Sequence, residues 1–374
     1  MRILVINWQD RTHPQSGGAE VHLHEIFGRI ARMGHDVHLL CCGHGTAPAY
    51  EVLDDLHVYR VGHRPTFNYS VPRWWKQYGA GMKLDIVIDD INKIPFFTPL
   101  YIRQPLLAIV HHFFGSAIFN EAGWLAGTYV KMFEDRIGRV YRSTPVVAVS
   151  ESTRQECLER GFGASSVSVI HNAIDHRSYP MRVGTKSTSP SVVYFGRLKK
   201  YKSVDHVIKA MALVRETIPD AHLHILGTGD ERTELERLVD FHDLQDTVTF
   251  HGYVTDAQKV AHLSAAHVAV NSSVKEGWGI TNIEANACGT PVISANVPGL
   301  RDSVRDGLSG LLYPYGNIEQ LAQLMTRVLV DHPERTRLSE GAVAWASTFT
   351  WERSAREMLD RCENTIQSWK QTHG

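Results

Sequence analysis

Short apolar stretches alternate with amphipathic helical patterns along almost the whole chain, and this alternation constrains the fold more than any other feature. Strands of a parallel sheet are buried on both faces and read as short apolar runs, whereas the connecting helices carry one apolar stripe. The predicted strands of the first half are Arg2–Ile6, Asp36–Leu40, Val58–Val61, Asp85–Ile88, Leu106–Val110, Val146–Val149 and Val167–Ile170. The pattern predicts an α/β fold built on a parallel sheet covered by helices.

A second series of strands begins after a break in composition. Residues Arg182–Ser191 are rich in Gly, Thr, Ser and Lys, contain no large apolar side chain, and are typical of a linker. The strands predicted after it are Val192–Phe195, His222–Leu226, Thr247–Phe250, His267–Val270, Pro291–Ser294 and Gly310–Tyr313. The length of 374 residues suits two domains.

We therefore predict two doubly wound Rossmann-like domains that face each other across a cleft. The first domain spans residues 1–180, a linker spans 181–190, and the second domain spans 191–350. A helix over 351–374 is amphipathic and is expected to pack back on the first domain. Ligands of such sheets bind outside the carboxyl ends of the strands, so motifs at strand ends are the candidates for function.

The bulk composition excludes several classes of partner. Lys and Arg total 39 and Asp and Glu total 40, so no basic excess favours nucleic acid. The five cysteines are too scattered for a disulfide scaffold or a zinc motif, which favours a reducing, cytoplasmic compartment. The apolar start is too short for a signal peptide, and no run of 18 apolar residues predicts a membrane-spanning helix.

The segment from Lys275 to Glu284 carries the strongest functional signal. A glycine-bearing loop follows a buried strand and leads into a predicted helix, with Glu276 and Glu284 eight positions apart. The first amides of a helix have no internal partner, so Gly279, Ile280 and Thr281 can face an anion. The two carboxylates can accept hydrogen bonds from hydroxyls. An anion together with hydroxyls describes a nucleotide sugar.

A basic turn follows the first strand of the second domain. Gly196-Arg197-Leu198-Lys199-Lys200-Tyr201-Lys202 combines an arginine fork with a mobile lysine charge, and both suit a diphosphate. A charge run of this kind is more often a solvated surface turn. Its position at a strand end, in the same domain as the two-glutamate loop, favours the functional interpretation.

The first domain offers weaker candidates. Gly17 and Gly18 lie between the first strand and a helix, where a backbone can approach a phosphate, although a plain tight turn explains them equally well. His111 and His112 follow a strand, and a histidine there can bond a sugar hydroxyl or act as a base. Zinc binding is not expected, because adjacent residues of an extended chain point opposite ways.

Two further motifs favour a structural interpretation. Asp89 and Asp90 follow a predicted strand, with Asn92 and Lys93 after them; they could hold acceptor hydroxyls, but turn chemistry is the preferred explanation. Trp74 and Trp75 lie among cations, which suits a peripheral membrane contact, but a packed helix with one wet face is the preferred interpretation.

The segment Glu276 to Glu284 resembles the E-x7-E signature of retaining glycosyltransferases of family four, which have the two-domain GT-B fold. The resemblance covers nearly the whole chain. It includes the Gly17-Gly18 loop, the basic turn, Val169–Asp175, which is similar to an interdomain V-I-x-N-G-V-D segment, and Gly289-Thr290-Pro291-Val292-Ile293. The chain departs from the pattern at Trp278, where Phe is usual, and at Ala173, where Gly is usual. Neither change removes a functional group.

The resemblance implies a role for each candidate residue. Arg197 and Lys202 would bind the donor diphosphate, Glu284 the ribose hydroxyls, and Glu276 the donor sugar. Gly17 and Gly18 would touch phosphate from the opposite domain. His111 would lie beside the reacting sugar; the adjacent His112 leaves this assignment ambiguous by one position.

The implied activity is transfer of a hexose-type sugar with retention of configuration, by same-face displacement. The donor would be UDP- or GDP-linked, and the acceptor a glycan, a lipid-linked molecule or a small molecule. No metal or other cofactor is expected, because no D-x-D pair is present and Arg197 and Lys202 supply the positive charge. Two alternatives stay open: a nucleotide-sugar-binding protein without transferase activity, and a sugar-nucleotide epimerase of the same two-domain plan.

Overall fold

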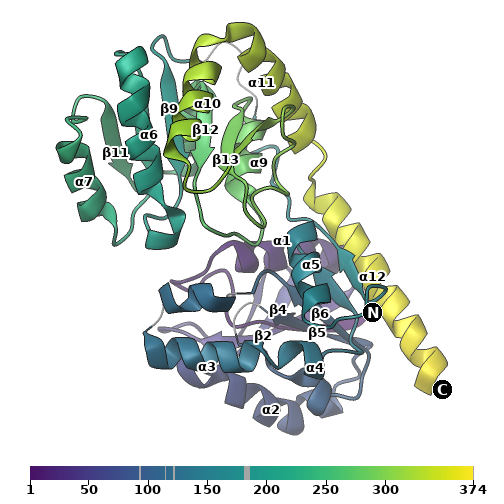
Figure 1. The fold of residues 1–374 in the computed structure, drawn as a ribbon. Helices are drawn as coiled ribbons and strands as arrows, with labels where there is room; N and C mark the ends of the chain where they lie inside the picture. Colours follow the sequence, from purple (N-terminus) through teal and green to yellow (C-terminus); the bar gives the residue numbers. More distant parts are fainter. Residues whose placement is uncertain (92–93, 114, 121–122, 181–185, 374) are drawn as a thin grey trace. The chain divides into compact units, whose positions relative to one another are not determined.

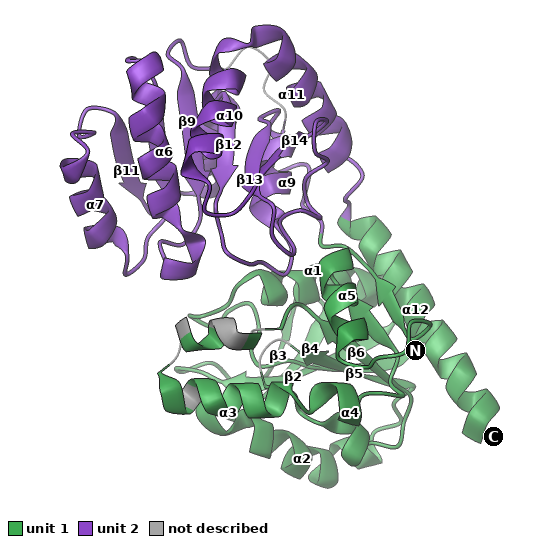
Figure 2. Cartoon of the chain, in the orientation of Figure 1, with its two compact units in different colours: residues 1–172, 351–374 green, residues 173–350 purple. Residues whose placement is uncertain are grey.

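The computed structural model describes residues 1–373 apart from 92–93, 114, 121–122 and 181–185. The chain forms two compact units, residues 1–172 with 351–374 and residues 173–350 (Figure 2). The predicted boundary at residue 180 is too late, because Tyr179 packs against an apolar cluster of the second unit. The Ser187 amide likewise donates to the Ala265 carbonyl, so the described end of the predicted linker belongs to the second unit. Residues 181–185 of that linker lie outside the described residues.

The first unit contains a sheet with the strand order β3-β4-β2-β1-β5-β6-β7-β8 (Figure 1). All neighbours pair in parallel except β3 and β4. The strands are β1 (Arg2–Ile6), β2 (Asp36–Gly43), β3 (Tyr50–Leu53), β4 (Leu56–His63), β5 (Ile86–Ile91), β6 (Leu106–Val110), β7 (Val146–Ala148) and β8 (Val167–Val169). Strand β3 was not predicted from the sequence, because it is an edge strand that exposes Tyr50 and Val52.

Helices cover this sheet, and the C-terminal helix lies among them. The helices are α1 (Gly18–Arg32), α2 (Phe67–Gln77), α3 (Trp124–Glu134), α4 (Ile137–Val140), α5 (Glu151–Glu159) and α12 (Trp351–His373), with short 3-10 turns at η1 (Arg64–Thr66), η2 (Gly79–Gly81), η3 (Thr98–Leu100) and η4 (Gly115–Asn120). Helix α12 packs against α1, where the Arg29 guanidinium lies 3.0 Å from the Glu352 carboxylate. Met358 and Cys362 on its inner face are fully buried.

The tryptophan pair of α2 is part of the core. Trp74 and Trp75 are only 8% and 6% exposed, and they pack with Leu4, Ile6 and Phe67. The interpretation of this segment as a packed helix is therefore correct, and these two rings do not offer a surface to a membrane. No helix among the described residues has the length and hydropathy needed to cross a bilayer.

The second unit contains a fully parallel sheet with the order β11-β10-β9-β12-β13-β14. Its strands are β9 (Ser191–Phe195), β10 (His222–Leu226), β11 (Val248–Gly252), β12 (Val268–Asn271), β13 (Val292–Ala295) and β14 (Gly310–Tyr313). Its helices are η5 (Lys200–Lys202), α6 (Val204–Thr217), α7 (Arg232–Phe241), α8 (Asp256–Ala265), α9 (Ile280–Ala287), α10 (Ile318–Val330) and α11 (His332–Ala346).

The pairing of β9 with β12 brings the two main predicted motifs together. Val270 of β12 lies beside Tyr194 of β9 in parallel register. One face of the sheet buries a large core under α6, α7 and α10, and the other face buries a smaller cluster with α8 and α9. Because the strands are parallel, the basic turn after β9 and the two-glutamate loop after β12 leave the same edge of the sheet.

Candidate functional site

The basic turn after β9 holds its two predicted functional cations in different environments. The fully buried Leu198 anchors the turn, and its amide donates to the Thr228 carbonyl. Arg197 is exposed, and its Nη2 donates to the Tyr201 hydroxyl at 2.9 Å. Lys202 is mostly buried, with 15% of its side chain exposed. The turn therefore presents one exposed and one sheltered positive charge.

Lys202 forms an ion pair with the first glutamate of the loop after β12. Its Nζ lies 2.5 Å from Oε1 of Glu276, whose side chain is 19% exposed. The two segments are also joined through the backbone, because the Val274 amide donates to the Tyr201 carbonyl and the Ser272 hydroxyl to the Lys202 carbonyl. Burial disfavours the ammonium charge, but the Glu276 carboxylate raises the pKa of Lys202 above its ordinary value, so this lysine stays charged.

The position of Glu276 depends on a glycine in a neighbouring loop. The Glu276 amide donates to the Pro298 carbonyl at 3.3 Å. Gly299 follows with a φ of +78°, and a Cβ atom added to it would lie 2.0 Å from the Glu276 carbonyl oxygen. This close approach requires glycine both for its backbone conformation and for space.

We expect Gly299→Ala to destabilise the second unit and to displace Glu276. The left-handed conformation alone costs about 1–2 kcal/mol for a residue with a Cβ atom, and overpacking adds roughly 1–3 kcal/mol. Gly307→Ala is the matched control, because Gly307 has a φ of +72° but open space around its Cβ position. Urea unfolding measures both variants, and equal losses of stability would contradict the close approach.

The start of α9 is held by a buried polar network. Asn282 donates to the hydroxyls of Ser294 and Ser303, and the Asn271 amide donates to Thr281 Oγ1 at 3.1 Å. A Cβ atom on Gly279 would lie 2.4 Å from the Ser303 hydroxyl. This packing explains the glycine independently of any ligand.

The amides at this helix start are partly used within the chain. The Ile280 amide donates to the Trp278 carbonyl, and the Asn282 amide donates to the Gly279 carbonyl. For the Thr281 amide, no such bond is found in the described part of the chain. The same holds for the Gly279 amide, so of the three residues predicted to face an anion, Gly279 and Thr281 retain the capacity to do so.

Glu284 lies in the second turn of α9 and is 8% exposed. A favourable interaction with the helix dipole does not explain a carboxylate at this position, because the dipole acts mainly within the first turn. Its Oε1 accepts bonds from the Tyr179 hydroxyl at 2.5 Å and from Lys259 Nζ at 3.2 Å. Its buried Oε2 has no hydrogen-bond partner among the described residues. A buried carboxylate oxygen in this state is suited to accept a bond from a ligand hydroxyl.

Tyr179 and Lys259 were not singled out from the sequence. Lys259 Nζ also lies 2.5 Å from the Tyr179 hydroxyl, so the three side chains form a closed triangle. Burial and the nearby Glu284 charge raise the pKa of Tyr179, which keeps its hydroxyl protonated. The triangle fixes Oε1 of Glu284 in place and leaves Oε2 available.

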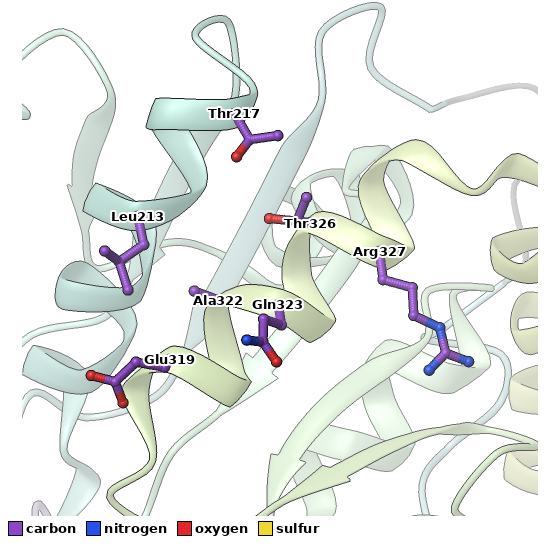
Figure 3. Close-up of a pocket in the computed structure, with 7 residues that line it drawn as sticks. All are labelled: Leu213, Thr217, Glu319, Ala322, Gln323, Thr326 and Arg327. Atoms are coloured by element: carbon purple, nitrogen blue, oxygen red, sulfur yellow. The ribbon is translucent and has the colours of Figure 1, made fainter.

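A separate pocket of about 490 Å³ lies between α6 and α10 (Figure 3). Its lining is Leu213, Thr217, Glu319, Ala322, Gln323, Thr326 and Arg327. None of these residues was predicted to take part in function. The pocket is therefore not the predicted site.

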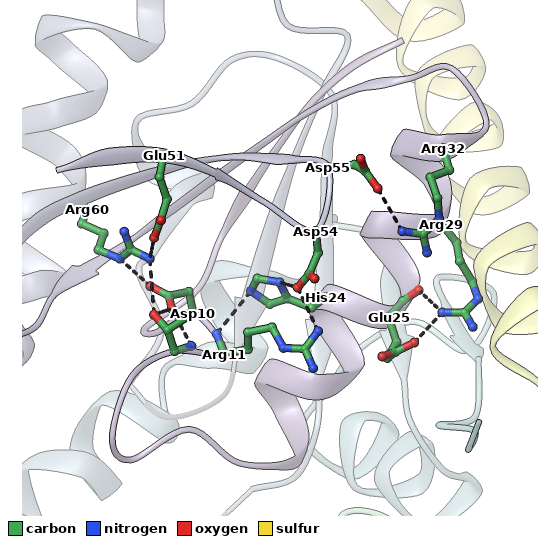
Figure 4. Close-up of polar contacts among 11 residues, drawn as sticks. Asp10, Arg11, His24, Glu25, Arg29, Arg32, Glu51, Asp54, Asp55 and Arg60 are labelled. Carbon is green, nitrogen blue, oxygen red and sulfur yellow. Dashed lines mark hydrogen bonds and ion pairs between the residues drawn. The ribbon is translucent and has the colours of Figure 1, made fainter. Parts of the chain in front are cut away.

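In the first unit, a buried ion pair holds the loop that follows β1 (Figure 4). The Arg60 guanidinium lies 2.7 Å from Oδ2 of Asp10, and both side chains are almost fully buried. Burial alone would favour a neutral Asp10, but its bonds to Arg60 and Thr12 hold the pKa of this carboxyl far below its usual range. Arg11, the next residue, pairs with Asp54 at 2.9 Å. The loop leading to Gly17 is therefore anchored at its start.

Gly17 and Gly18 are exposed at the start of α1. The Gly17 amide donates to Oε2 of the buried Glu20 at 2.7 Å, so it is already engaged. Gly17 has an extended backbone, and a Cβ atom on Gly18 would meet nothing within 4 Å. Neither the local backbone nor the neighbouring side chains of the first unit require glycine here. Open space at this turn is compatible with the close approach of a ligand.

His111 lies directly after β6, is 5% exposed and pairs with Asp90. Its Nε2 lies 2.8 Å from Oδ1 of Asp90, and its ring contacts His22 edge-on with centroids 5.0 Å apart. Burial opposes the imidazolium charge, but the Asp90 carboxylate raises the pKa of His111. In contrast, burial lowers the pKa of His22 far below its ordinary value, so His22 is neutral.

The interpretation of Asp89 and Asp90 as turn residues is wrong. Strand β5 continues through Ile91, so Asp89 and Asp90 lie inside it and are fully buried. Asp89 Oδ2 accepts bonds from the hydroxyls of Thr98 and Tyr141, and burial raises the pKa of Asp89 to about 6. Neither carboxylate is exposed to hold an acceptor. The companion residues 92–93 lie outside the described residues.

We expect Asp90→Asn to destabilise the protein more at pH 6 than at pH 9. Because Asp90 raises the folded-state pKa of His111 above the unfolded value of about 6.5, the ion pair contributes below pH 6.5 as long as Asp90 is ionised; burial also raises the pKa of Asp90, so the contribution falls again at lower pH. That contribution is lost as the pH rises through the folded pKa of His111. The stability gap between wild type and Asp90→Asn should shrink from pH 6 to pH 9 in urea unfolding. A gap that widens over this range would contradict the pairing.

Comparison with known proteins gives the class of the chain. Residues 16–178 match the family model described as Glycosyltransferase Family 4, and residues 177–345 match the one described as Glycosyl transferases group 1. Together the two models span residues 16–345, which include most of both units. The chain belongs to the glycosyltransferases with a GT-B fold.

Individual proteins agree with this class. The chain is 27% identical to a glycogen synthase of Mycobacterium tuberculosis, over 94% of this chain and 92% of that protein. Among solved structures, sucrose-phosphate synthase from Thermosynechococcus elongatus superposes with a TM-score of 0.83 at 21% identity, over 98% of this chain and 99% of that one. HepE of Anabaena in complex with UDP-glucose superposes with a TM-score of 0.75 at 19% identity, over 97% and 100%. These structural likenesses show the GT-B fold.

Proposed function

We propose that this glycosyltransferase moves a hexose-type sugar from a nucleoside-diphosphate sugar to an acceptor hydroxyl with retention of configuration. One observation carries the proposal: the charged Lys202–Glu276 pair and the available Oε2 of Glu284 follow neighbouring strands at one edge of a parallel sheet. A cation and a hydroxyl acceptor are the two groups that a nucleoside diphosphate needs.

The donor would lie on the second unit. Arg197 and Lys202 bind the diphosphate, with the Gly279–Thr281 backbone contributing an amide at the helix start. Glu284 accepts from the ribose through Oε2, and Glu276 contacts the transferred sugar. UDP is the favoured nucleotide, with GDP as the alternative, since a solved relative of the same fold was crystallised with UDP-glucose.

The first unit would supply the remaining groups. Gly17 and Gly18 leave room for a phosphate at the start of α1. His111, held by Asp90, donates a hydrogen bond to the reacting sugar. The acceptor is a glycan, a lipid-linked molecule or a small molecule; the glycogen synthase relative favours a glycan.

The chemical step is a same-face displacement. The bond from the anomeric carbon to the diphosphate oxygen breaks, and a bond from that carbon to the acceptor oxygen forms on the same face. The departing diphosphate takes the acceptor proton. Arg197 and Lys202 stabilise the charge that develops on the diphosphate, so no metal ion is needed. Glu276 is paired with Lys202 and is not assigned as a nucleophile.

We also propose that the protein works in the cytoplasm, at the inner face of the membrane when its acceptor is lipid-linked. All five cysteines are unpaired and buried, which suits a reducing compartment. Trp124 and Leu125 at the start of α3 are 74% and 77% exposed, and they form an apolar surface suited to a peripheral contact.

The proposal is tested by thermal shift against UDP-glucose, UDP-galactose, GDP-mannose and ADP-glucose. A donor at 100 times its dissociation constant should stabilise the protein by about 2.7 kcal/mol. Glu284→Gln should weaken this stabilisation, whereas Glu319→Gln, in the separate pocket between α6 and α10, should not.

The donor that binds is then incubated with glucan and lipid acceptors, and the product is analysed by NMR. An α-linked product from an α-linked donor supports retention. A bound donor that stays intact with every acceptor would favour the binding-protein alternative, and a donor whose sugar is inverted at a ring carbon would favour the epimerase. If none of the four nucleotide sugars stabilised the protein, the proposal would be contradicted.

A further inference from the structure

Three histidines from three elements of the second unit converge at one point. They are His224 in β10, His251 in β11 and His262 in α8, and one ligand atom from each lies within 4.8 Å of the others. His224 Nδ1 is 3.1 Å from His251 Nε2, and the ring centroids of His251 and His262 are 4.3 Å apart. We call these residues the histidine cluster.

The sheet geometry explains the convergence. Leu223 and Ile225 on β10 enter the large core, so His224 between them lies on the opposite face, where Leu226 packs with residues of α8. The pairing of β10 with β11 shifts register: Ile225 pairs with Phe250, but Leu226 pairs with Gly252. His251 is therefore the extra residue of a bulge. Bulges of this kind re-aim a side chain.

The helix above this face completes the cluster. Val260 and Leu263 of α8 are buried against the sheet. The His262 ring of the same helix lies 5.7 Å from the His224 ring, centroid to centroid, so it reaches the strands. The three histidines are half-buried, and β11 is the edge strand of its sheet. A small cation can therefore reach the cluster from solvent.

The composition of the cluster is that of a metal site. A hydrogen bond between two imidazoles would explain two neighbouring histidines but not the third. Here three imidazoles face one another, and the group contains no carboxylate. Neutral imidazole is the form that binds metal. Imidazole nitrogens suit Zn²⁺, Cu²⁺ and Ni²⁺.

We propose that the histidine cluster binds a divalent transition-metal ion, with Zn²⁺ the favoured ion. In a tetrahedral site with Zn–N bonds of about 2.0 Å, two ligand nitrogens lie roughly 3.3 Å apart. The separation of 3.1 Å between His224 and His251 is close to this value. Rotation of the His262 side chain brings in the third nitrogen, and water takes the fourth position.

This metal ion would act on structure and not on the sugar transfer. It would join β10, the edge strand β11 and α8. Because α8 also carries Lys259, which bonds Glu284, the ion would hold the helix that positions the second glutamate. The inference concerns residues outside the proposed donor site, so it stands or falls independently of the proposed function.

The test measures Zn²⁺ and Co²⁺ binding to the full chain, produced without a polyhistidine tag and stripped with chelator. Titration against a chromophoric zinc indicator should give one equivalent of Zn²⁺ bound in the micromolar range or tighter, with a rise in Tm. Co²⁺ should give the visible absorption of a tetrahedral ion. His262→Ala should weaken Zn²⁺ binding at least tenfold and abolish the rise in Tm.

His251→Gln is the second variant, in case His262→Ala does not fold, and circular dichroism checks the fold of each. His242→Ala is the matched control, because its ring contacts Phe241 and lies outside the cluster. It should bind Zn²⁺ as the wild type does. Equal Zn²⁺ affinity in wild type, His262→Ala and His251→Gln would overturn the proposal, as would the absence of a stoichiometric site in the wild type.

Discussion

Lys202→Ala is expected to lower kcat by roughly two to three orders of magnitude, which corresponds to ~3–4 kcal/mol of barrier for a lost charged donor at the leaving group. Lys202 keeps its charge because Glu276 raises its pKa, and it is held 2.5 Å from that carboxylate. In the proposed donor complex, the ammonium would lie between two anions and neutralise the leaving group. Its removal also leaves Glu276 close to the diphosphate with no counter-charge, so repulsion adds to the loss.

The matched control for this variant lies two residues away. The side chain of Lys200 is 81% exposed in the same turn, so Lys200→Ala removes an equal charge outside the ion pair. We expect near-normal kcat from Lys200→Ala, and a large loss from Arg197→Ala. Initial rates with the matched donor, together with an unfolding curve for each variant, make the comparison. Near-normal turnover in both Lys202→Ala and Arg197→Ala would remove these residues from the diphosphate site.

The local sequence was sufficient for several elements that are buried on both faces, although the fully buried strand β5 runs past its predicted end at Ile88 to Ile91. The bounds predicted for Arg2–Ile6, Leu106–Val110, His222–Leu226 and Gly310–Tyr313 are those of β1, β6, β10 and β14. Strands of this kind are short apolar runs bounded by polar residues, so their pattern is clear. The edge strand β3 lacks this pattern because one of its faces is wet.

The pairing of the two donor motifs required more than the local pattern. The sequence indicated that Lys202 and Glu276 each follow the carboxyl end of a strand. The two residues are 74 positions apart, so this did not show that they meet. Only the neighbouring positions of β9 and β12 in the sheet bring them into contact. The resemblance to a known family implied that both residues act on one donor, but neither it nor the residues alone predicted their ion pair.

Buried charges were the main source of error. Asp90 was interpreted as a turn residue, since Asp is common in turns, whereas a buried carboxylate needs a partner. Its partner, His111, lies 21 positions away, directly after the neighbouring strand β6. Tyr179 and Lys259 were missed for the same reason, because their common contact, Glu284, is 105 and 25 positions distant. No periodicity marks a pair whose members meet only after folding.

Lys259→Met is expected to destabilise the second unit by about 3–5 kcal/mol, the usual effect of removing one partner from a buried ion pair. The side chains of Lys259 and Glu284 are 9% and 11% exposed, so water cannot replace the lost ammonium. The Glu284 charge would be left with the Tyr179 hydroxyl alone. Donor affinity should fall as well, because Oε2 loses the fixed orientation that the triangle gives it.

A double-mutant cycle separates the pair from the cavity that the substitution leaves. Glu284→Gln in the Lys259→Met background removes the uncompensated charge, so the double variant should recover part of the lost stability. Asp256→Asn is the control, because Asp256 lies 3.3 Å from Lys259 but its side chain is 91% exposed; its loss should stay below about 1 kcal/mol. The stability lost in the double variant could instead equal the sum of the losses in Lys259→Met and Glu284→Gln. The triangle of Lys259, Tyr179 and Glu284 would then not act as a unit. In that case the orientation of Oε2 would have to come from the packing of α9 alone.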